Sequence, residues 1–310
     1  MIAVRANDVG QRGGINSKLI FIDCGCTLNK QGVYGKILMD EENPGGQRLG
    51  ELFTNIFGYG ILVTHNHKDH TNLIETIVKK GGRQKYFIVK PMSKKAFLIW
   101  GKLNINNMLI SDWLKFCSSD FPRIESSLGP RVRVVPMRPE KWENNRAQNA
   151  EHDFNIMYLV EFAGRRILFP GDVSPQFFTQ IMNNPKYARE MASVDFLVLP
   201  HHGSNQAGEL SSFHIIHPEM CIICSNPIEK HHLPWSDVSG FSFKNGKGVE
   251  VKSHAISTRS GNINAELPIF VTGNTVQQGY YELVIEADGT AKLFYGPVAR
   301  LKNIWCFRSL

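Results

Sequence analysis

Short apolar runs alternate with polar turns and amphipathic stretches along most of the chain. The apolar runs have the length of β-strands, and several end abruptly in a polar residue. They predict strands at residues 18–23, 60–64, 86–89, 132–135, 156–160, 166–169, 196–199 and 220–224. Apolar positions three and four residues apart predict helices over residues 47–56, 71–80, roughly 93–118, 175–184 and 208–216. The segment Ala163-Gly164-Arg165 predicts a hairpin turn between two of the strands.

The mixed order of strands and helices predicts one α/β domain over residues 1–310. A helical insertion is expected at about residues 91–130, and its aromatic residues Trp100, Trp113 and Phe116 are expected to pack in a core or a lid. Hydrophobic residues make up 42% and charged residues 20% of the chain, as in an ordinary globular protein. Because no uninterrupted apolar run reaches about 18 residues, no membrane span is expected.

The six cysteines are scattered and mostly lie in apolar, strand-like surroundings. Cys221 and Cys224 have the spacing of a redox or zinc motif, but isoleucines occupy both positions between them. That composition favours a buried strand. Scattered thiols, together with an N-terminus interrupted early by charge at Arg5 and Asp8, lead us to expect a cytoplasmic protein.

The segment from Thr64 to His70 concentrates three histidines and an aspartate directly behind an apolar strand. Neutral imidazole nitrogen binds borderline transition-metal ions, and a carboxylate adds charge compensation. On an extended segment, residues two apart point the same way, so His65 and His67 are expected to bind one ion. Asp69 and His70 come where the chain is expected to turn into a helix, and they would face a second ion. A histidine-rich surface turn is the alternative interpretation.

A two-metal hydrolase needs further ligands, including a negatively charged group that bridges both ions. Asp172 follows the predicted strand at residues 166–169 and a glycine that permits a tight exit, so we predict that it is this bridging ligand. His152 lies just ahead of another predicted strand and is predicted to be a ligand as well. One of the adjacent histidines His231 and His232 is predicted to complete the second metal site, with His232 favoured.

Another histidine pair, His201 and His202, follows the predicted strand at residues 196–199 and lies close to Ser204. Histidine can protonate a leaving oxygen, and hydroxyl and backbone N–H groups can bind a phosphate. We therefore predict that both histidines and Ser204 are catalytic, together with Asp69, and the roles of the two histidines stay open. A structural turn at the strand end is the alternative.

These motifs and their order resemble those of the metallo-β-lactamase superfamily. The matching positions are Asp23 in Phe21-Ile22-Asp23-Cys24-Gly25, the run His65-Asn66-His67-Lys68-Asp69-His70, His152, Asp172 and His232. Within the superfamily the chain is most similar to the soluble hydrolase domain of competence-type (ComEC-like) proteins. That similarity rests on Asp8-Val9-Gly10-Gln11, Ile167-Leu168-Phe169-Pro170-Gly171-Asp172, Pro200-His201-His202-Gly203-Ser204, and Gly248-Val249-Glu250-Val251 leading to Thr258-Arg259-Ser260-Gly261. The chain departs from that group where Arg12 follows Gln11 and where Leu233 separates the last histidine from Pro234. These departures concern the substrate rather than the metal chemistry.

The resemblance implies an α/β fold of the four-layer αββα type, with two mixed sheets between outer helices and the metal ions at one sheet edge. It implies that His65, His67 and His152 hold one ion, that Asp69, His70 and His232 hold the other, and that Asp172 lies between the ions. Asp69 would also orient an attacking hydroxide, and Asp23 would steady a ligand histidine. The implied cofactors are two divalent ions, Zn²⁺ or Mn²⁺, since a mixed set of histidine and aspartate ligands accepts either.

These expectations favour a metal-dependent phosphodiesterase, in particular a nuclease that cleaves DNA or RNA with a metal-activated water. A formal net charge of +7 suits a polyanionic partner such as nucleic acid. The alternatives are a hydrolase of a small molecule, such as a cyclic nucleotide or a lactone, and a regulatory subunit whose site has decayed. The sequence does not indicate whether the chain has a protein partner or forms homo-oligomers.

Overall fold

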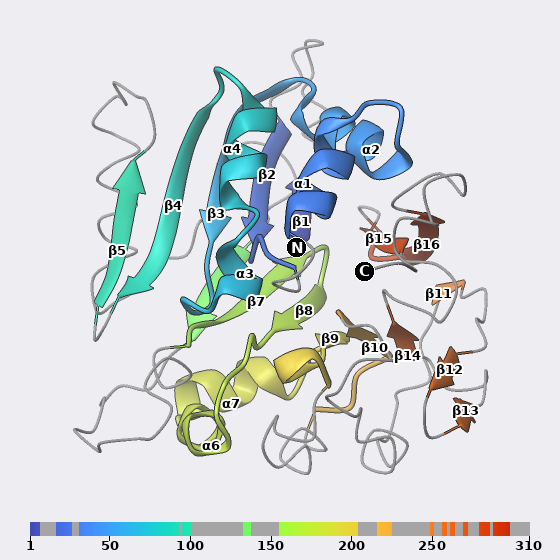
Figure 1. Cartoon of the computed structure of the whole chain (residues 1–310). Helices are drawn as coiled ribbons and strands as arrows, with labels where there is room; N and C mark the ends of the chain where they lie inside the picture. Colours follow the sequence, from blue (N-terminus) through green and yellow to red (C-terminus); the bar gives the residue numbers. More distant parts are fainter. Residues whose placement is uncertain are drawn as a thin grey trace. The chain divides into compact units, whose positions relative to one another are not determined.

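The computed structural model divides into two compact units, each built from strands and helices (Figure 1). Unit 1 comprises Met1–Pro136 and Trp142–Ile156, and unit 2 comprises Met137–Lys141 and Met157–Leu310. The structure describes residues 1–6, 17–26, 31–92, 95–100, 133–137, 155–203, 216–224, 249–250, 256–258, 261–263, 269–271, 279–285 and 288–297. The fold class is mixed α/β, as predicted. The prediction of a single domain over residues 1–310 stays a prediction.

Unit 1 contains a five-stranded mixed sheet with the order β1-β2-β3-β4-β5. The central pairs β2/β3 and β3/β4 are parallel, whereas β1/β2 and β4/β5 are antiparallel. Its strands are β1 (Ile2–Ala6), β2 (Ser17–Ile22), β3 (Ile56–Leu62), β4 (Lys85–Met92) and β5 (Lys95–Trp100). Its helices are α1 (Gln31–Met39), α2 (Pro44–Phe53), α3 (Lys68–Thr71) and α4 (Ile74–Gly81).

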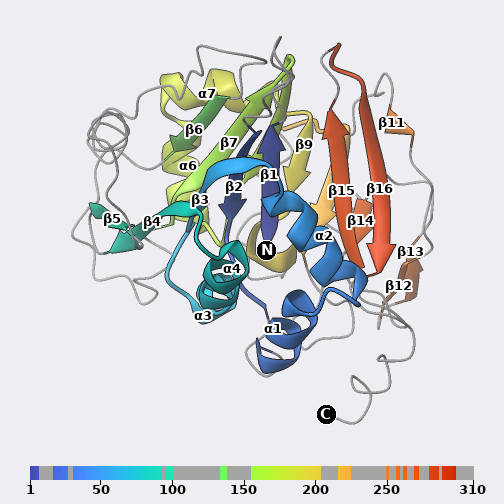
Figure 2. The ribbon, with the colours of Figure 1, turned by 90° about the horizontal axis from the view of Figure 1, so that it is seen from above.

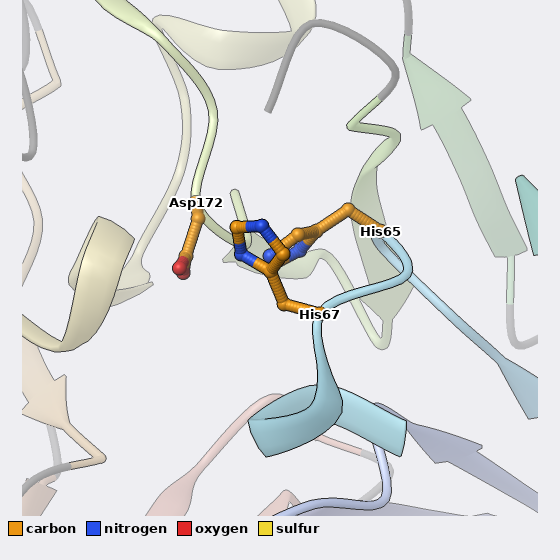
Figure 3. Close-up of side chains that lie close together, drawn as sticks. All are labelled: His65, His67 and Asp172. Carbon is orange, nitrogen blue, oxygen red and sulfur yellow. The ribbon is translucent and has the colours of Figure 1, made fainter. Parts of the chain in front are cut away.

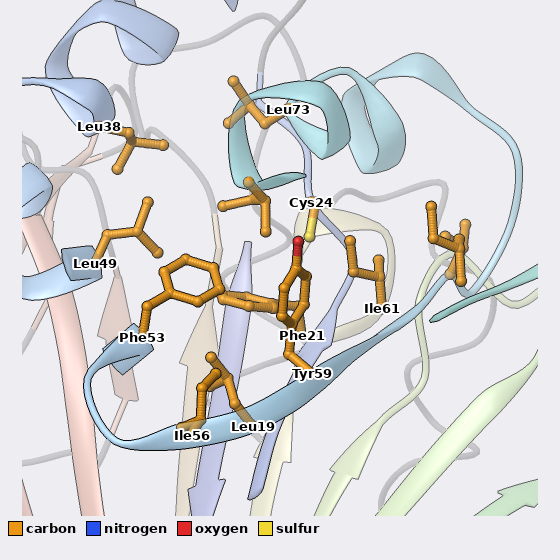
Figure 4. Close-up of a cluster of buried hydrophobic side chains, with 13 residues drawn as sticks. Leu19, Phe21, Cys24, Leu38, Leu49, Phe53, Ile56, Tyr59, Ile61 and Leu73 are labelled. Atoms are coloured by element: carbon orange, nitrogen blue, oxygen red, sulfur yellow. The ribbon is translucent and has the colours of Figure 1, made fainter. Parts of the chain in front are cut away.

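One face of this sheet is covered by the apolar sides of α1, α2 and α4 (Figures 1 and 4). Aromatic rings form the centre of that core: the Phe53 and Tyr59 rings lie 5.0 Å apart, and Phe21 contacts both. Burying such large apolar side chains is the main favourable term in folding. The packing fixes β2 and β3 beside each other, so the carboxyl ends of these two parallel strands meet at one sheet edge.

The prediction of a helix over roughly residues 93–118 is wrong for residues 95–100. These residues form β5, which pairs antiparallel with β4 from Met92↔Lys95 to Phe87↔Trp100. The run Ala96-Phe97-Leu98-Ile99-Trp100 is rich in aromatic and branched residues, which fit a pleated sheet, and the edge of β4 offers backbone partners. Residues 101–130 of the predicted insertion lie outside the described residues.

The main sheet of unit 2 has the order β14-β10-β9-β8-β7-β6. β7 and β8 form an antiparallel hairpin, and the pairs β8/β9, β9/β10 and β10/β14 are parallel. The strands are β6 (Arg133–Met137), β7 (Met157–Phe162), β8 (Arg165–Phe169), β9 (Phe196–Val198), β10 (Met220–Ile223) and β14 (Ile269–Val271). The helices are α6 (Pro175–Met182), α7 (Pro185–Met191) and the short 3₁₀ turn η3 (Pro200–Gly203).

Two small sheets complete the described part of unit 2. The first has the order β11-β16-β15 and contains β11 (Val249–Glu250), β15 (Gly279–Ile285) and β16 (Ala291–Pro297). Its strands β15 and β16 run side by side in Figure 2 and pair antiparallel along their whole length. The second sheet pairs β12 (Ile256–Thr258) with β13 (Gly261–Ile263).

The strands predicted from apolar runs are confirmed within a few residues as β2, β3, β4, β6, β7, β8, β9 and β10. The predicted hairpin turn is confirmed too, because Phe162 pairs with Arg165 and both intervening residues, Ala163 and Gly164, have positive φ. The helices predicted over residues 47–56, 71–80 and 175–184 correspond to α2, α4 and α6. Residues 208–215 of a further predicted helix lie outside the described part.

Cys221 is fully buried in β10, which confirms the interpretation of its apolar surroundings as a strand. Burial raises the pKa of its thiol far above the ordinary value, so the neutral thiol is retained. The four cysteines within the described ranges, Cys24, Cys26, Cys221 and Cys224, are free thiols. Among the described helices, none combines the length and apolar composition that a membrane crossing requires.

Candidate metal centre

The histidine cluster of unit 1 begins where β3 leaves the sheet. The chain continues beside β4 for one more residue, since the Val63 N–H donates to the Val89 carbonyl at 2.9 Å. The next carbonyl, that of Thr64, accepts from the Ile156 N–H at 2.8 Å. These bonds hold Thr64 and His65 fully buried. The chain then turns into α3, which has His67 at its N-cap and carries Asp69 and His70.

The three imidazoles of this segment lie close together within unit 1. The ring centroids of His65 and His67 are 4.6 Å apart, and those of His65 and His70 are 4.1 Å apart. His65 and His70 are buried, whereas His67 and Asp69 are partly exposed. In Figure 3 the rings of His65 and His67 extend from the same loop. The structure thus brings the three rings together, and a solvated surface turn would not bury two of them.

Asp23, the residue directly after β2, contacts this cluster through its buried carboxylate. Its Oδ1 accepts from the Thr64 N–H at 2.8 Å, and its Oδ2 accepts from the Thr64 hydroxyl at 2.8 Å and contacts Nδ1 of His70 at 2.8 Å. The predicted contact of Asp23 with a histidine of the cluster is therefore present. Burial alone would raise the pKa of this carboxyl, but the charge and hydrogen bond of His70, with smaller contributions from His65 and Thr64, lower it overall.

These hydrogen bonds determine which ring nitrogen of each histidine carries the proton. A carboxylate only accepts, so Nδ1 of His70 is the donor in its contact with Asp23. The single hydroxyl proton of Thr64 goes to Asp23, and Nδ1 of His65, 3.1 Å from that hydroxyl, is therefore the donor to it. In the neutral rings of His65 and His70, Nε2 then carries the lone pair that a metal ion needs.

Asp172 occupies the corresponding place in unit 2, where the chain leaves β8. Gly171 has a φ of 61°, a conformation that glycine adopts without strain, and it makes the tight exit that the sequence predicted. The Asp172 side chain is buried, with its Oδ2 lying 3.7 Å from Nε2 of His201. Figure 3 shows its carboxylate on the chain that follows β8. His201 is held there because its N–H donates to the Gly171 carbonyl at 3.0 Å.

His201 and His202 form the η3 turn directly after β9, and both have the left-handed backbone conformation, with φ of 48° and 55°. That conformation is strained for residues with a side chain and is often found at functional sites. Nδ1 of His202 lies 2.9 Å from the carbonyl oxygen of Cys224, the residue after β10. Because a carbonyl only accepts, Nδ1 is the donor, and Nε2 of the neutral His202 ring carries its lone pair.

Each unit by itself places side chains of a metal-binding type at the carboxyl ends of its parallel strands. In unit 1 these are His65, His67, Asp69 and His70, and in unit 2 they are Asp172, His201 and His202. The donors are imidazole nitrogens and carboxylate oxygens, a set that fits Zn²⁺ or Mn²⁺. The predicted site residues His152, Ser204, His231 and His232 lie outside the described residues, so their roles stay predictions.

Thr64 and the Cys224 carbonyl were not predicted from the sequence as parts of the site. Each fixes the tautomer of a histidine through a hydrogen bond. Both hydrogen bonds join residues at the ends of neighbouring strands, so they depend on the order of the strands in the sheet. The position of Thr64, immediately before the first histidine of the cluster, was the one signal available.

No family model matches the chain, and no curated protein sequence matches it either. The function is therefore inferred from the chemistry of the two groups of side chains.

Proposed function

We propose that this protein is a metal-dependent hydrolase that cleaves phosphodiester bonds in DNA or RNA with two divalent ions, Zn²⁺ or Mn²⁺. The observation that carries the proposal is the hydrogen-bond network of Asp23. It presents Nε2 of both His65 and His70 in the form that binds a metal ion. A network that orients two buried histidines in this way is expected at a metal centre.

The proposed centre follows the ligand sets that the motif order implies. His65 and His67 would hold one ion, and Asp69 and His70 would hold the other. Asp172 is proposed as the group between the ions, and His152 and His232 remain proposed ligands. The overall architecture that goes with this centre is the four-layer αββα sandwich of the metallo-β-lactamase superfamily, which we propose for the whole chain.

Bound divalent ions would polarise a phosphoryl oxygen and lower the pKa of a bound water. The chain's own side chains have the remaining tasks. The Asp69 carboxylate would accept a hydrogen bond from the attacking water and orient it. His201 would donate a proton to the leaving oxygen, as general acids do. The formal net charge of +7 suits a polyanionic substrate.

The tautomer of His202 favours a ligand role for this residue over a role in proton donation. Its Nδ1–H is directed to the Cys224 carbonyl, and its Nε2 carries the lone pair. His201, in contrast, lies within 3.7 Å of the Asp172 carboxylate through Nε2 itself. We therefore assign metal binding to His202 and proton donation to His201.

Exchanging these histidines separately for alanine is expected to give different losses. His202→Ala should weaken binding of one ion by about 10–100-fold, because a ligand is removed. His201→Ala should leave both ion affinities within about threefold and lower kcat by about 10²–10⁴-fold, the usual contribution of a general acid. Metal titration by calorimetry and steady-state kinetics at saturating metal measure the two effects. The reverse distribution of losses would contradict the assignment.

The proposed activity is tested by supplying the full chain with Zn²⁺ or Mn²⁺ and offering several phosphodiesters. The substrates are single-stranded, duplex and circular nucleic acids, cyclic dinucleotides and bis-p-nitrophenyl phosphate. We expect cleavage of nucleic acid that stops when a chelator is added. His217→Ala is the matched control, since it removes an exposed histidine outside both ligand groups and should retain full activity. Absence of cleavage of every substrate with either metal would overturn the proposal.

A further inference from the structure

The residues that follow Asp23 form a second backbone contact with the histidine cluster of unit 1. The Cys24 N–H donates to the His70 carbonyl at 2.7 Å, and the Leu73 N–H donates to the Cys24 carbonyl at 2.7 Å. The Asn72 side chain adds a pair of bonds to Cys26, accepting from its N–H at 2.9 Å and donating to its carbonyl at 2.7 Å. Four hydrogen bonds thus join residues 24–26 to the turn that carries Asp69 and His70.

Gly25 lies at the centre of this contact, and no larger residue fits there. A Cβ atom added to Gly25 would lie 1.7 Å from the carbonyl oxygen of Asp69, 2.2 Å from its carbonyl carbon and 2.5 Å from the backbone nitrogen of His70. All three atoms belong to the backbone, so no side-chain rotation can relieve the overlap. The glycine is needed here for close approach rather than for an unusual backbone angle.

We propose that Gly25 and Asn72 are positioning residues that set the place of Asp69 and His70, the pair assigned to the second metal ion. This inference rests on the proposed two-ion centre. The backbone of His65 is held differently, through bonds from Val63 to β4 and from Thr64 to Ile156. A change at Gly25 therefore acts most directly on the ligands of the second ion and leaves the backbone that carries His65 in place. His67, assigned to the first ion, belongs to the same turn, because its carbonyl accepts from the His70 N–H at 3.1 Å.

Gly25→Ala is expected to lower the affinity for the second ion by about 10–100-fold, the usual loss when the groups that orient ligands are disturbed. The affinity for the first ion should fall by a smaller factor, because the backbone around His65 keeps its own bonds to Val89 and Ile156. Calorimetric titration of the full chain with Zn²⁺ and Mn²⁺ resolves the two binding steps. The visible absorption spectrum of the Co²⁺-loaded protein gives a second readout that depends on ligand geometry rather than on catalysis.

Two other glycines provide matched controls. Gly46→Ala creates a comparable overlap in α2, where the added Cβ would lie 2.0 Å from the Asp40 carbonyl oxygen and 2.6 Å from that of Ile37. It is expected to destabilise unit 1 without altering the ratio of the two ion affinities. Gly32→Ala in α1 adds a Cβ into open space and should behave as the wild type.

Asn72→Ala tests the same contact without adding volume, because it removes both side-chain bonds to Cys26. It is expected to lower the affinity for the second ion, as Gly25→Ala does. If Gly25→Ala does not fold, the ion affinities of Asn72→Ala test the inference. Wild-type-like binding of both ions by a folded Gly25→Ala or, in its absence, by Asn72→Ala would overturn this inference alone. It would also be overturned if Gly25→Ala lowered the affinities for both ions by the same factor, as is expected for Gly46→Ala. A folded wild type that binds no ion would overturn the proposed function, and this inference with it.

Discussion

Asp69→Asn is expected to lower kcat for phosphodiester hydrolysis by about 10³-fold or more. The substitution keeps the size of the side chain but removes a negative charge that would both bind the second ion and orient the attacking water. Two-metal centres supply several kcal/mol of transition-state stabilisation, and each 1.36 kcal/mol corresponds to about tenfold in rate. Steady-state kinetics on bis-p-nitrophenyl phosphate at saturating Mn²⁺ measure the loss.

Glu75→Gln is the control for this substitution. It makes the same change of carboxylate to amide nearby, on an exposed side chain of α4 that pairs with Lys79 at 2.7 Å. Exposed ion pairs of this kind contribute little to stability, so activity and stability should stay close to those of the wild type. If Asp69→Asn retained more than about a tenth of the wild-type kcat, Asp69 would have no place in the catalytic centre.

Asp23→Ala is expected to have the largest combined effect on stability and metal binding. The buried carboxylate accepts from the Thr64 N–H, the Thr64 hydroxyl and Nδ1–H of His70. Leaving buried donors without that acceptor costs about 1–3 kcal/mol each, so the free energy of unfolding should fall by at least about 3 kcal/mol. The tautomers of His65 and His70 would also lose their constraint, and ion affinities should fall about 10–100-fold. Urea denaturation of the metal-free protein and metal titration measure the two losses.

Asp288 offers a close match to Asp23 in an exposed setting. Its carboxylate accepts from the Thr290 N–H at 2.9 Å and from the Thr290 hydroxyl at 2.8 Å, in a turn before β16. Asp288→Ala should have a much smaller effect on the free energy of unfolding, since water replaces the lost acceptor, and should leave metal binding unchanged. Equal stability losses in the two variants, or unaltered metal affinity in Asp23→Ala, would refute the role assigned to the Asp23 network.

The central strands of both units were predictable because their apolar runs are short, continuous and bounded by polar residues. β5 was not, since its apolar and aromatic residues suit a helix or a strand and only pairing with β4 decides between them. α1 was missed because Gly32 and Gly35 lower its helix propensity, and burial of Ile37 and Leu38 compensates for that loss. α7 carried a readable start signal, Asn184 followed by Pro185, and Asn184 does cap the helix.

Within the candidate centre, the closeness of His65 and His67 was predictable from their two-residue spacing, whereas the short distance between the rings of His65 and His70 was not. The tautomers of the histidines were not predictable either. They depend on Asp23 reaching Thr64 across neighbouring parallel strands, and on the Cys224 carbonyl reaching His202 in the same way. Such contacts join residues far apart in the sequence, and only the order and register of the strands determine them.

We propose that this chain binds two divalent ions and needs both to hydrolyse phosphodiesters. Stepwise addition of Mn²⁺ or Zn²⁺ to chelator-treated protein, with bound metal and hydrolysis of bis-p-nitrophenyl phosphate measured in the same samples, tests this directly. We expect uptake that saturates at about two ions per chain, with most of the rate appearing as the second site fills. Folded protein that takes up no ion, or a rate that does not depend on bound metal, would contradict it.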